Sequence, residues 1–234
     1  MLLIAIYYVE DTPQSNSPTV ASNDDNATSG YADNIDNYEQ ARSVFWRELY
    51  PSGNTLYCDM PFDGSRRDGI NVEHIFPMSW ATNGLDCGTR NQCRDNSRLF
   101  NQIEADLHNL YPSRTEVNSA RSSYAFAEIN GESRQFGRDC DFEVSEQQRL
   151  AEPRPEIRGD VARAMFYMAY RYKDQGLVLF SRQARLLQDW HQSDPPGNSE
   201  KSRNEAIAAI QNNRNPFVDD PDYLNNLVVE GYFF

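Results

Sequence analysis

The residues Asn71-Val-Glu-His-Ile-Phe-Pro-Met78 place a carboxylate and an imidazole side by side in an otherwise apolar run. The apolar members favour an extended strand, and Pro77 cannot donate to a sheet ladder, so we expect a short buried strand that ends near it. Neighbouring side chains of a regular strand point to opposite faces. Glu73 and His74 can therefore serve one site only where the strand ends or bends. Taken alone, the stretch fits a buried ion pair and an active site equally well.

The length and the charge distribution limit what surrounds this stretch. A chain of 234 residues is long enough for one sizeable core, and 12% aromatic residues are typical of a globular protein. The net charge of −13 argues at first against a nucleic-acid partner. However, residues 1–41 hold seven acids and no base, and residues 219–234 hold four acids and no base. The body, 42–218, has 24 acids and 22 bases, so it is nearly neutral.

The basic residues are almost all arginine. Twenty of the 22 are Arg and two are Lys. The planar guanidinium suits bidentate contacts to phosphate and to carboxylate. A general arginine preference in an acidic, salt-adapted protein explains most of them equally well.

The first 32 residues differ from the rest. Residues 1–9 are a short apolar run without a basic residue, too short to span a membrane, and we expect the remnant of a secretion signal. Residues 12–30 are rich in Ser, Asn, Asp, Thr and Pro, which is typical of a disordered linker. We therefore expect a signal remnant and acidic linker over 1–32 and a single domain over 33–234.

Four cysteines are present, an even number without a C-x-x-C motif. Cys87 and Cys93 are near enough in sequence to close a small loop, which leaves Cys58 to meet Cys140. Two disulfides would indicate an oxidising compartment. A zinc site of Cys87, Cys93 and His108 is the alternative, although it lacks the usual paired spacing.

Local patterns predict a mainly helical chain. Apolar residues recur at helical spacing over 157–172, and 183–192 and 204–211 also fit helices. Near the opening stretch we expect a helix that begins near a capping box at Asp36 and Glu39, a strand at 56–58, a turn at 63–69 and a loop at 82–95 that carries Arg90.

A second informative run follows the loop. Ser113-Arg-Thr-Glu116 has the form of a capping box and predicts a helix that starts at Ser113. Asn118 and Arg121 would lie on this helix. A mid-helix asparagine is more often a surface residue, but with Glu73 and His74 upstream it gains a chemical meaning.

That meaning is phosphodiester hydrolysis. A water must lose a proton, and a histidine with an ordinary pKa of about 6.5 suits that step. A hard divalent cation can stabilise the negative charge on the phosphoryl group, and Mg²⁺ needs only one or two protein oxygen ligands. Glu73 and Asn118 would supply them, and an arginine such as Arg90 would hold the phosphate.

Several separated segments resemble the bacterial endonuclease I family, periplasmic or secreted nonspecific nucleases with the ββα-metal (His-Me finger) fold. The resemblance covers roughly residues 38–220. The matching segments are Glu73-His74 with Pro77, Arg90 between two cysteines, Glu104-Ala-Asp-Leu-His-Asn-Leu-Tyr-Pro112, Glu116-Val-Asn118 with Arg121, 158–168, Trp190, and 203–204 through 213–218.

The resemblance implies an α+β fold: a mainly helical single domain built around a ββα-metal motif. It also implies a periplasmic or secreted, monomeric, Mg²⁺-dependent endonuclease, with Mn²⁺ or Ca²⁺ as substitutes. The enzyme would cut DNA and RNA without sequence preference, leave 5′-phosphate ends and have no membrane partner. The residues it assigns are His74 as general base, Glu73 and Asn118 on the metal, Arg90 on the phosphate, Glu104 within the active-site motif, and Arg121 as a further phosphate contact. For His108 we favour a buried structural role.

The alternative hypothesis is a protein without catalytic activity. It would be a secreted binding module in which Glu73 and Asn118 hold a structural cation. A zinc protease is less compatible with the sequence, since no His-Glu-x-x-His is present.

Overall fold

The computed structural model describes residues 35–65, 67–229 and 231–233. Residues Ala32–Phe234 form one compact unit of α+β class, rich in helices and with three small sheets. The expected signal remnant and linker lie outside the described residues, so that boundary stays a prediction. None of the helices in the described part is long and apolar enough to cross a membrane.

The helices and strands are as follows. The helices are α1 (Tyr38–Val44) with the π-helical turn η1 (Phe45–Leu49), α2 (Met78–Leu85), α3 (Arg90–Asn96), α4 (Arg98–Glu104), α5 (Thr115–Arg121), α6 (Arg158–Arg171), α7 (Ser181–Ser193), α8 (Asn198–Gln211), α9 (Pro216–Asp219) and α10 (Pro221–Val229), with short 3-10 turns at 107–109, 155–157 and 173–175. The strands are β1 (Gly53–Asn54), β2 (Pro61–Phe62), β3 (Ile70–His74), β4 (Leu110–Arg114), β5 (Ala125–Phe126), β6 (Phe142–Ser145) and β7 (Leu150–Pro153).

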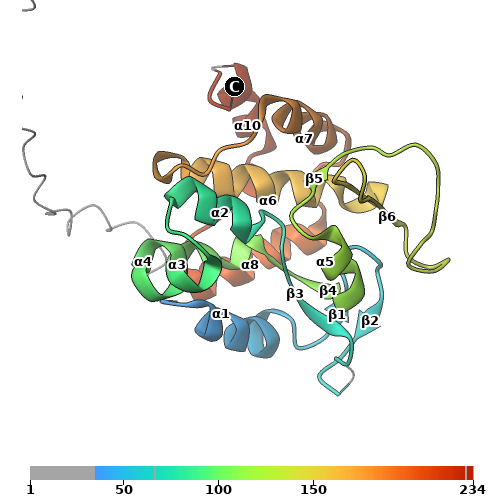
Figure 1. The fold of residues 1–234 in the computed structure, drawn as a ribbon, viewed down its shortest axis with the longest axis horizontal. Coiled ribbons are helices and arrows are strands. Elements are labelled where there is room, and N and C mark those ends of the chain that lie inside the picture. Colours follow the sequence, from blue (N-terminus) through green and yellow to red (C-terminus); the bar gives the residue numbers. More distant parts are fainter. Residues whose placement is uncertain (1–34, 66, 230, 234) are drawn as a thin grey trace, which may run out of the picture. The chain divides into compact units, whose positions relative to one another are not determined.

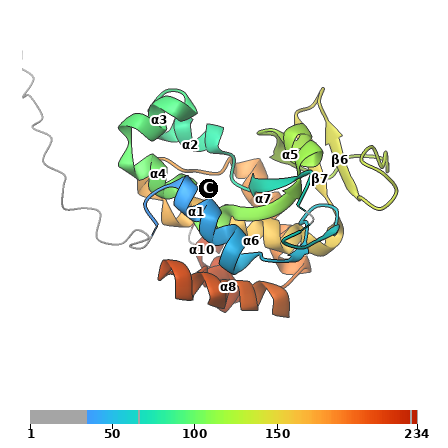
Figure 2. The same ribbon diagram turned by 90° about the horizontal axis from the view of Figure 1, so that it is seen from below.

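An antiparallel ladder of β3 and β4 occupies the middle of this unit. Its register pairs Glu73 with Tyr111 and His74 with Leu110. Helices α2, α3 and α4 lie on one side of the ladder, and α5 and the three-stranded sheet of β5, β7 and β6 lie on the other (Figures 1 and 2). The ladder therefore separates two groups of elements, and a site at its end can draw on both.

A buried asparagine ends β3. The Ile75 N–H still donates to the Asn109 carbonyl at 3.0 Å, but the next N–H, of Phe76, donates to the Asn109 side-chain oxygen at 2.7 Å. The Asn109 amide returns a bond to the Phe76 carbonyl at 3.0 Å. A side chain thus takes the place of the partner strand, and the chain turns toward Pro77, directly before α2. The strand ends near Pro77, as the sequence predicted.

Helix α6 forms the centre of the hydrophobic core. Ten of its fourteen residues are buried, which is expected of a helix covered on all sides. The helices predicted over 157–172 and 183–192 are confirmed as α6 and α7, and the one predicted over 204–211 is the second half of α8. A further cluster beneath the ladder joins Phe45, Val72, Leu110 and Ile207, from four separate elements.

The loop expected over 82–95 is wrong. Helix α2 continues to Leu85 and α3 begins at Arg90, so only four residues between them are non-helical. A capping box of Thr89 and Gln92 starts α3 and satisfies its first N–H groups. The Thr89-x-x-Gln92 pattern is a helix-start signal present in the sequence itself.

The capping box expected at Ser113 and Glu116 is also wrong. Ser113 lies in β4 opposite Asn71, and its hydroxyl donates to the Arg114 carbonyl. Pairing with β3 holds Ser113 extended, so α5 starts two residues later, at Thr115. The strand expected at 56–58 is likewise a turn, flanked by β1 and β2.

The structure contains the disulfides Cys58–Cys140 and Cys87–Cys93. These bonds exclude the zinc alternative, because neither Cys87 nor Cys93 retains a thiolate. His108 is 1% exposed, packs against the Tyr167 ring at 4.4 Å and has its Nε2 3.4 Å from the Asn213 carbonyl. His108 is therefore part of the core.

Candidate active site

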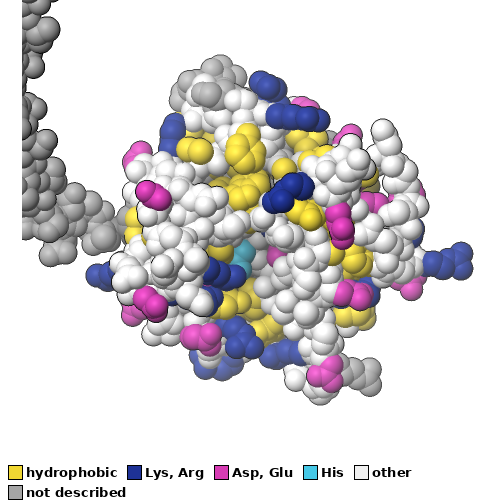
Figure 3. Space-filling model, viewed as in Figure 1, with side chains coloured by type: hydrophobic (Ala, Val, Ile, Leu, Met, Phe, Trp, Pro, Cys, Tyr) yellow, Lys and Arg dark blue, Asp and Glu magenta, His cyan; other side chains and the backbone are white. Residues whose placement is uncertain are grey.

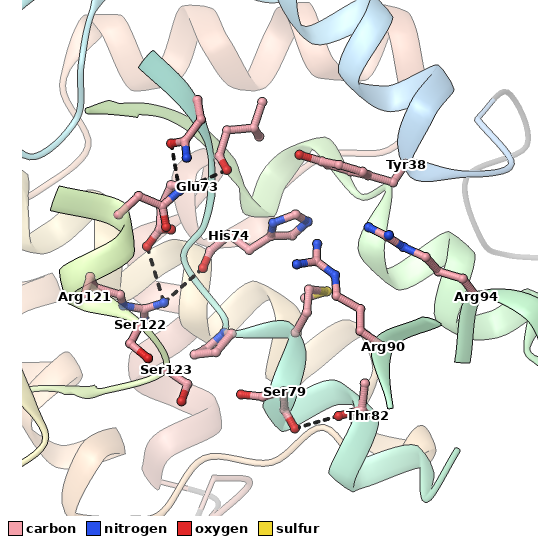
Figure 4. A pocket seen from close by; sticks show the side chains of 15 residues that line it. Tyr38, Glu73, His74, Ser79, Thr82, Arg90, Arg94, Arg121, Ser122 and Ser123 are labelled. Carbon is pink, nitrogen blue, oxygen red and sulfur yellow. Dashed lines mark hydrogen bonds and ion pairs between the residues drawn. The ribbon is translucent and has the colours of Figure 1, made fainter. Parts of the chain in front are cut away.

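A pocket of about 560 Å³ opens at the end of β3. Residues of α1, β3, α2, α3 and α5 line it. Figure 3 shows it as a hollow with the histidine at its base. In the close-up, Glu73 and Arg121 border one side, Arg90, Arg94 and Tyr38 border the other, and His74 lies between them (Figure 4).

The ionisable side chains that line the pocket are mostly basic. Three guanidinium groups, those of Arg90, Arg94 and Arg121, face one carboxylate, that of Glu73. With the Glu104 carboxylate that pairs with Arg90 and Arg94 included, the cluster has one positive charge in excess, although the chain carries −13 overall. Net charge does not exclude an anionic ligand here.

Glu73 is held by two partners from other elements. Its side chain is 3% exposed; the Tyr57 hydroxyl donates to Oε1 at 2.7 Å, and Arg121 Nη1 lies 3.3 Å from the same oxygen. Burial raises the pKa of Glu73 above its ordinary value, although the Arg121 charge and the Tyr57 hydrogen bond oppose the shift. Both of these contacts use Oε1, and the carboxylate also accepts a hydrogen bond from the His74 backbone.

His74 points away from Glu73, as the alternation of a strand requires. Its Nε2 lies 3.0 Å from the backbone carbonyl of Glu104. A carbonyl oxygen only accepts, so Nε2 carries the proton and Nδ1 keeps its lone pair. Burial, together with the charge of Arg90, lowers the pKa of His74 to about 4. At neutral pH the imidazole is therefore uncharged and able to accept a proton.

Glu104 lies behind the pocket and orients two arginines. Its carboxylate is fully buried, pairs with the Arg90 Nε, and accepts from Arg94 Nε at 2.7 Å and Arg94 Nη2 at 2.8 Å. Burial alone would raise the pKa of Glu104, but the bonds from Arg94 and the charge of Arg90 hold it below its ordinary value. The Glu104 carboxylate thus fixes the orientation of both guanidinium groups.

Asn118 presents its amide to the pocket in one orientation. Its Nδ2 donates to the Asn71 side-chain oxygen at 2.9 Å and to the Val72 carbonyl at 3.1 Å. Both donor hydrogens are directed into β3, so Oδ1 is the atom that remains for a ligand. The Asn118 Oδ1 and the Glu73 carboxylate line one pocket and are hard oxygen donors, which fits a Mg²⁺ ion that keeps most of its waters.

The sequence predicts a phosphate contact for Arg121, and in the structure this side chain contacts the end of β3. Its side chain is 1% exposed and donates to the His74 carbonyl at 3.1 Å and the Ile75 carbonyl at 2.6 Å, besides its pairing with Glu73. These contacts fasten the end of β3 to α5. The side chains of Arg90 and Arg94 are more accessible from the pocket, at 43% and 36% exposed.

Three residues of the site were not found from the sequence. Tyr38 packs against the His74 ring at 5.2 Å and lies 5.8 Å from Arg90 and 5.7 Å from Arg94. Arg94 follows Arg90 by one helical turn, a relation that becomes visible once 90–96 is recognised as a helix. Tyr57 has no local sequence signal, since it reaches Glu73 only through the fold.

Comparison with known proteins gives one family and several relatives. The family model for endonuclease I matches residues 14–222. A periplasmic deoxyribonuclease of Aeromonas hydrophila is 36% identical over 159 residues, which cover 66% of this chain and 65% of that protein. An extracellular deoxyribonuclease of the same organism is 31% identical over 81% of this chain and 90% of its own length. An extracellular ribonuclease of Bacillus amyloliquefaciens is 34% identical over 67% of this chain and 53% of its own length.

Proposed function

Because the chain belongs to the bacterial endonuclease I family, we propose that it is a metal-dependent nuclease that hydrolyses phosphodiester bonds of DNA and RNA. The observation that carries the proposal is His74: a neutral imidazole whose Nε2 is fixed on the Glu104 carbonyl, at the base of an arginine-lined pocket. The order of β3, β4 and α5, an antiparallel pair followed by a helix, supports a ββα-metal motif.

The site residues divide the chemistry among them. Arg90 and Arg94, oriented by Glu104, bind the phosphate and place phosphorus beside His74. His74 Nδ1 takes a proton from water, the water oxygen bonds to phosphorus, and the bond to the 3′-oxygen breaks. The 3′-oxygen takes a proton from solvent, which leaves a 5′-phosphate on the other product.

A divalent cation held by Glu73 and Asn118 would stabilise the negative charge on the phosphoryl oxygens. Tyr57 and Arg121 keep the Glu73 carboxylate in place for it. A bound phosphate also brings negative charge near His74 and offsets the Arg90 charge, so the imidazole becomes more basic when substrate is present.

The relatives' names support both substrates and an extracytoplasmic location. Two are called deoxyribonucleases and one a ribonuclease, and their names read periplasmic or extracellular. The pocket's basic groups suit phosphate, which DNA and RNA share. The two disulfides also favour an oxidising compartment.

Plasmid digestion tests the proposal. We expect the purified protein to nick and then linearise supercoiled plasmid in Mg²⁺, and EDTA to abolish cleavage. A Glu73→Gln variant should need more Mg²⁺ for half-maximal rate, because one carboxylate ligand is lost. Cleavage that persists in EDTA would contradict the metal requirement, and no cleavage in any divalent cation would favour the cation-stabilised binding module.

Arg90→Ala tests the phosphate contact. We expect the variant to bind nucleic acid with a salt dependence whose log–log slope is shallower by about 0.7 to 0.9, the change for one lost phosphate contact. Binding is measured in Mg²⁺ on a His74→Ala background, so that the substrate stays intact. Arg214→Ala is the matched control, since its side chain is equally exposed, 42% against 43%, and lies outside the pocket lining. An equal slope change in both variants would contradict a specific role for Arg90.

A further inference from the structure

Two large apolar side chains remain exposed in the described part of the chain, and they are close in sequence. Val178 is 58% exposed and Phe180 57%, in the segment that leads into α7. A ring that stays exposed gains none of the free energy that burial of apolar surface supplies to folding. Its neighbours point to a function for it.

Phe180 packs on an aromatic residue of the helix that borders the catalytic pocket. Its ring centroid lies 5.0 Å from that of Trp80, and Trp80 meets the buried Phe76 edge-on at 5.6 Å. Phe76 is two residues beyond His74, and Ser79, directly before Trp80, lines the pocket. The Trp80–Phe180 platform, as we call this ring pair, is thus continuous with the rim of the site.

A close backbone contact joins α2, which carries Trp80, to the segment that carries Phe180. A Cβ atom built on Gly84, in α2, would lie 2.6 Å from the Gly176 carbonyl oxygen, and one on Gly176 would lie 2.6 Å from the Gly84 carbonyl oxygen. Only glycine at both positions allows this approach, and Gly176 also has a φ of +84°. The segment carrying Phe180 is therefore docked on α2 before any ligand arrives.

The size of the exposed aromatic surface and the charge beside it indicate which ligand would bind there. One exposed ring beside a second, half-buried ring matches a single nucleobase and is far smaller than a stable protein interface, which buries about 1,200 Å² or more. Arg182 is exposed in the first turn of α7, two residues after Phe180. Figure 3 shows hydrophobic side chains over α2 and the segment before α7, beside the hollow with the histidine, with basic side chains close by. Aromatic rings beside arginines suit a single strand.

We infer that the Trp80–Phe180 platform stacks an unpaired base of the strand whose phosphate occupies the catalytic pocket. The inference rests on the proposed nuclease function and adds a substrate preference. Bases within a duplex are already stacked and paired, and extruding one costs free energy. The chain should therefore favour single-stranded or locally melted nucleic acid over intact duplex.

Binding of short labelled oligonucleotides tests this, again in Mg²⁺ on a His74→Ala background. Phe180→Ala should weaken binding of a single strand about 5- to 100-fold, the effect of losing one stacked base, and change duplex binding less than about twofold. Phe180→Trp should bind as the parent does. Val178→Ala is the control, because it removes equally exposed apolar surface without a ring, and we expect a change of less than about twofold.

An abasic scan locates the stacked base. One position of the single strand should lose affinity when its base is removed, and that loss should disappear in the Phe180→Ala background. Equal weakening of single strand and duplex, an equal effect of Val178→Ala, or no effect of Phe180→Ala would overturn the inference.

The two proposals fail in different ways. A protein with His74 intact that cleaves, but whose strand preference does not depend on Phe180, overturns the platform alone. A protein that binds single strands through Phe180 but never cleaves overturns the nuclease function alone. A protein that binds neither single strand nor duplex overturns both.

Discussion

Replacing His74 with alanine should lower the rate of plasmid cleavage at saturating substrate by about 10²- to 10⁴-fold, the usual contribution of a general base. The imidazole is neutral because burial, with the Arg90 charge, lowers its pKa to about 4, and Nε2 is committed to the Glu104 carbonyl. Substrate binding should change little, because Arg90 and Arg94 keep their support from Glu104.

Two measurements separate lost chemistry from lost structure. The variant should unfold in urea near the parent's midpoint, since water in the open pocket can hydrogen-bond the Glu104 carbonyl. Free imidazole should restore part of the rate, because the vacated space opens to the pocket. A variant that retains full activity would remove His74 from the mechanism, and one that loses activity only through a lower unfolding midpoint would make the histidine structural.

Glu200→Gln should lower the free energy of unfolding by about 3 kcal/mol, at the lower end of the range for breaking a buried ion pair. The Arg163 guanidinium is fully buried and donates to the Glu200 carboxylate through Nε at 2.8 Å and Nη2 at 2.6 Å. Removing the carboxylate charge leaves the buried Arg163 guanidinium of α6 without its closest counter-charge. The loss stays near the lower end because Asp160, 3.9 Å from Arg163, supplies a second carboxyl group.

The effect of Glu200→Gln should depend on pH through Asp160. Burial and the charge of Glu200 raise the pKa of Asp160 to about 7, so the folded parent holds this proton after the unfolded chain has lost it. Asp160 therefore makes the parent less stable as pH rises from about 4 to 7. In the variant the Glu200 charge is gone, the pKa of Asp160 falls, and its carboxylate can pair with Arg163. The variant's deficit should be larger at pH 5.5 than at pH 8.

Glu205→Gln is the matched control for urea unfolding at both pH values. Glu205 is also in α8 and also pairs with an arginine, Arg214, at 2.6 Å, but its side chain is 74% exposed. An exposed pair contributes about 0 to 1 kcal/mol, so this change should be nearly silent. Equal losses in the two variants would show that burial of the Arg163 pair does not set its energetic importance.

The sequence was most informative where the chemistry depends on near neighbours. The adjacency of Glu73 and His74 before Pro77, and the helical periodicity that predicts α6, are patterns within a few residues. It was misleading at Ser113, where a helix-start pattern competes with strand pairing. The partner strand, about forty residues away, decides that competition, because the β3–β4 ladder satisfies backbone groups that a local cap would otherwise serve.

By itself, therefore, the sequence determined which side chains bring a carboxylate, an imidazole and an amide to this protein, and which family it resembles. Only the tertiary structure decided how they are used: that the Glu104 carboxylate orients Arg90 and Arg94, and that Arg121 fastens the end of β3. These roles come from contacts between segments far apart in the chain. Their free energy depends on packing and burial, which no local pattern records.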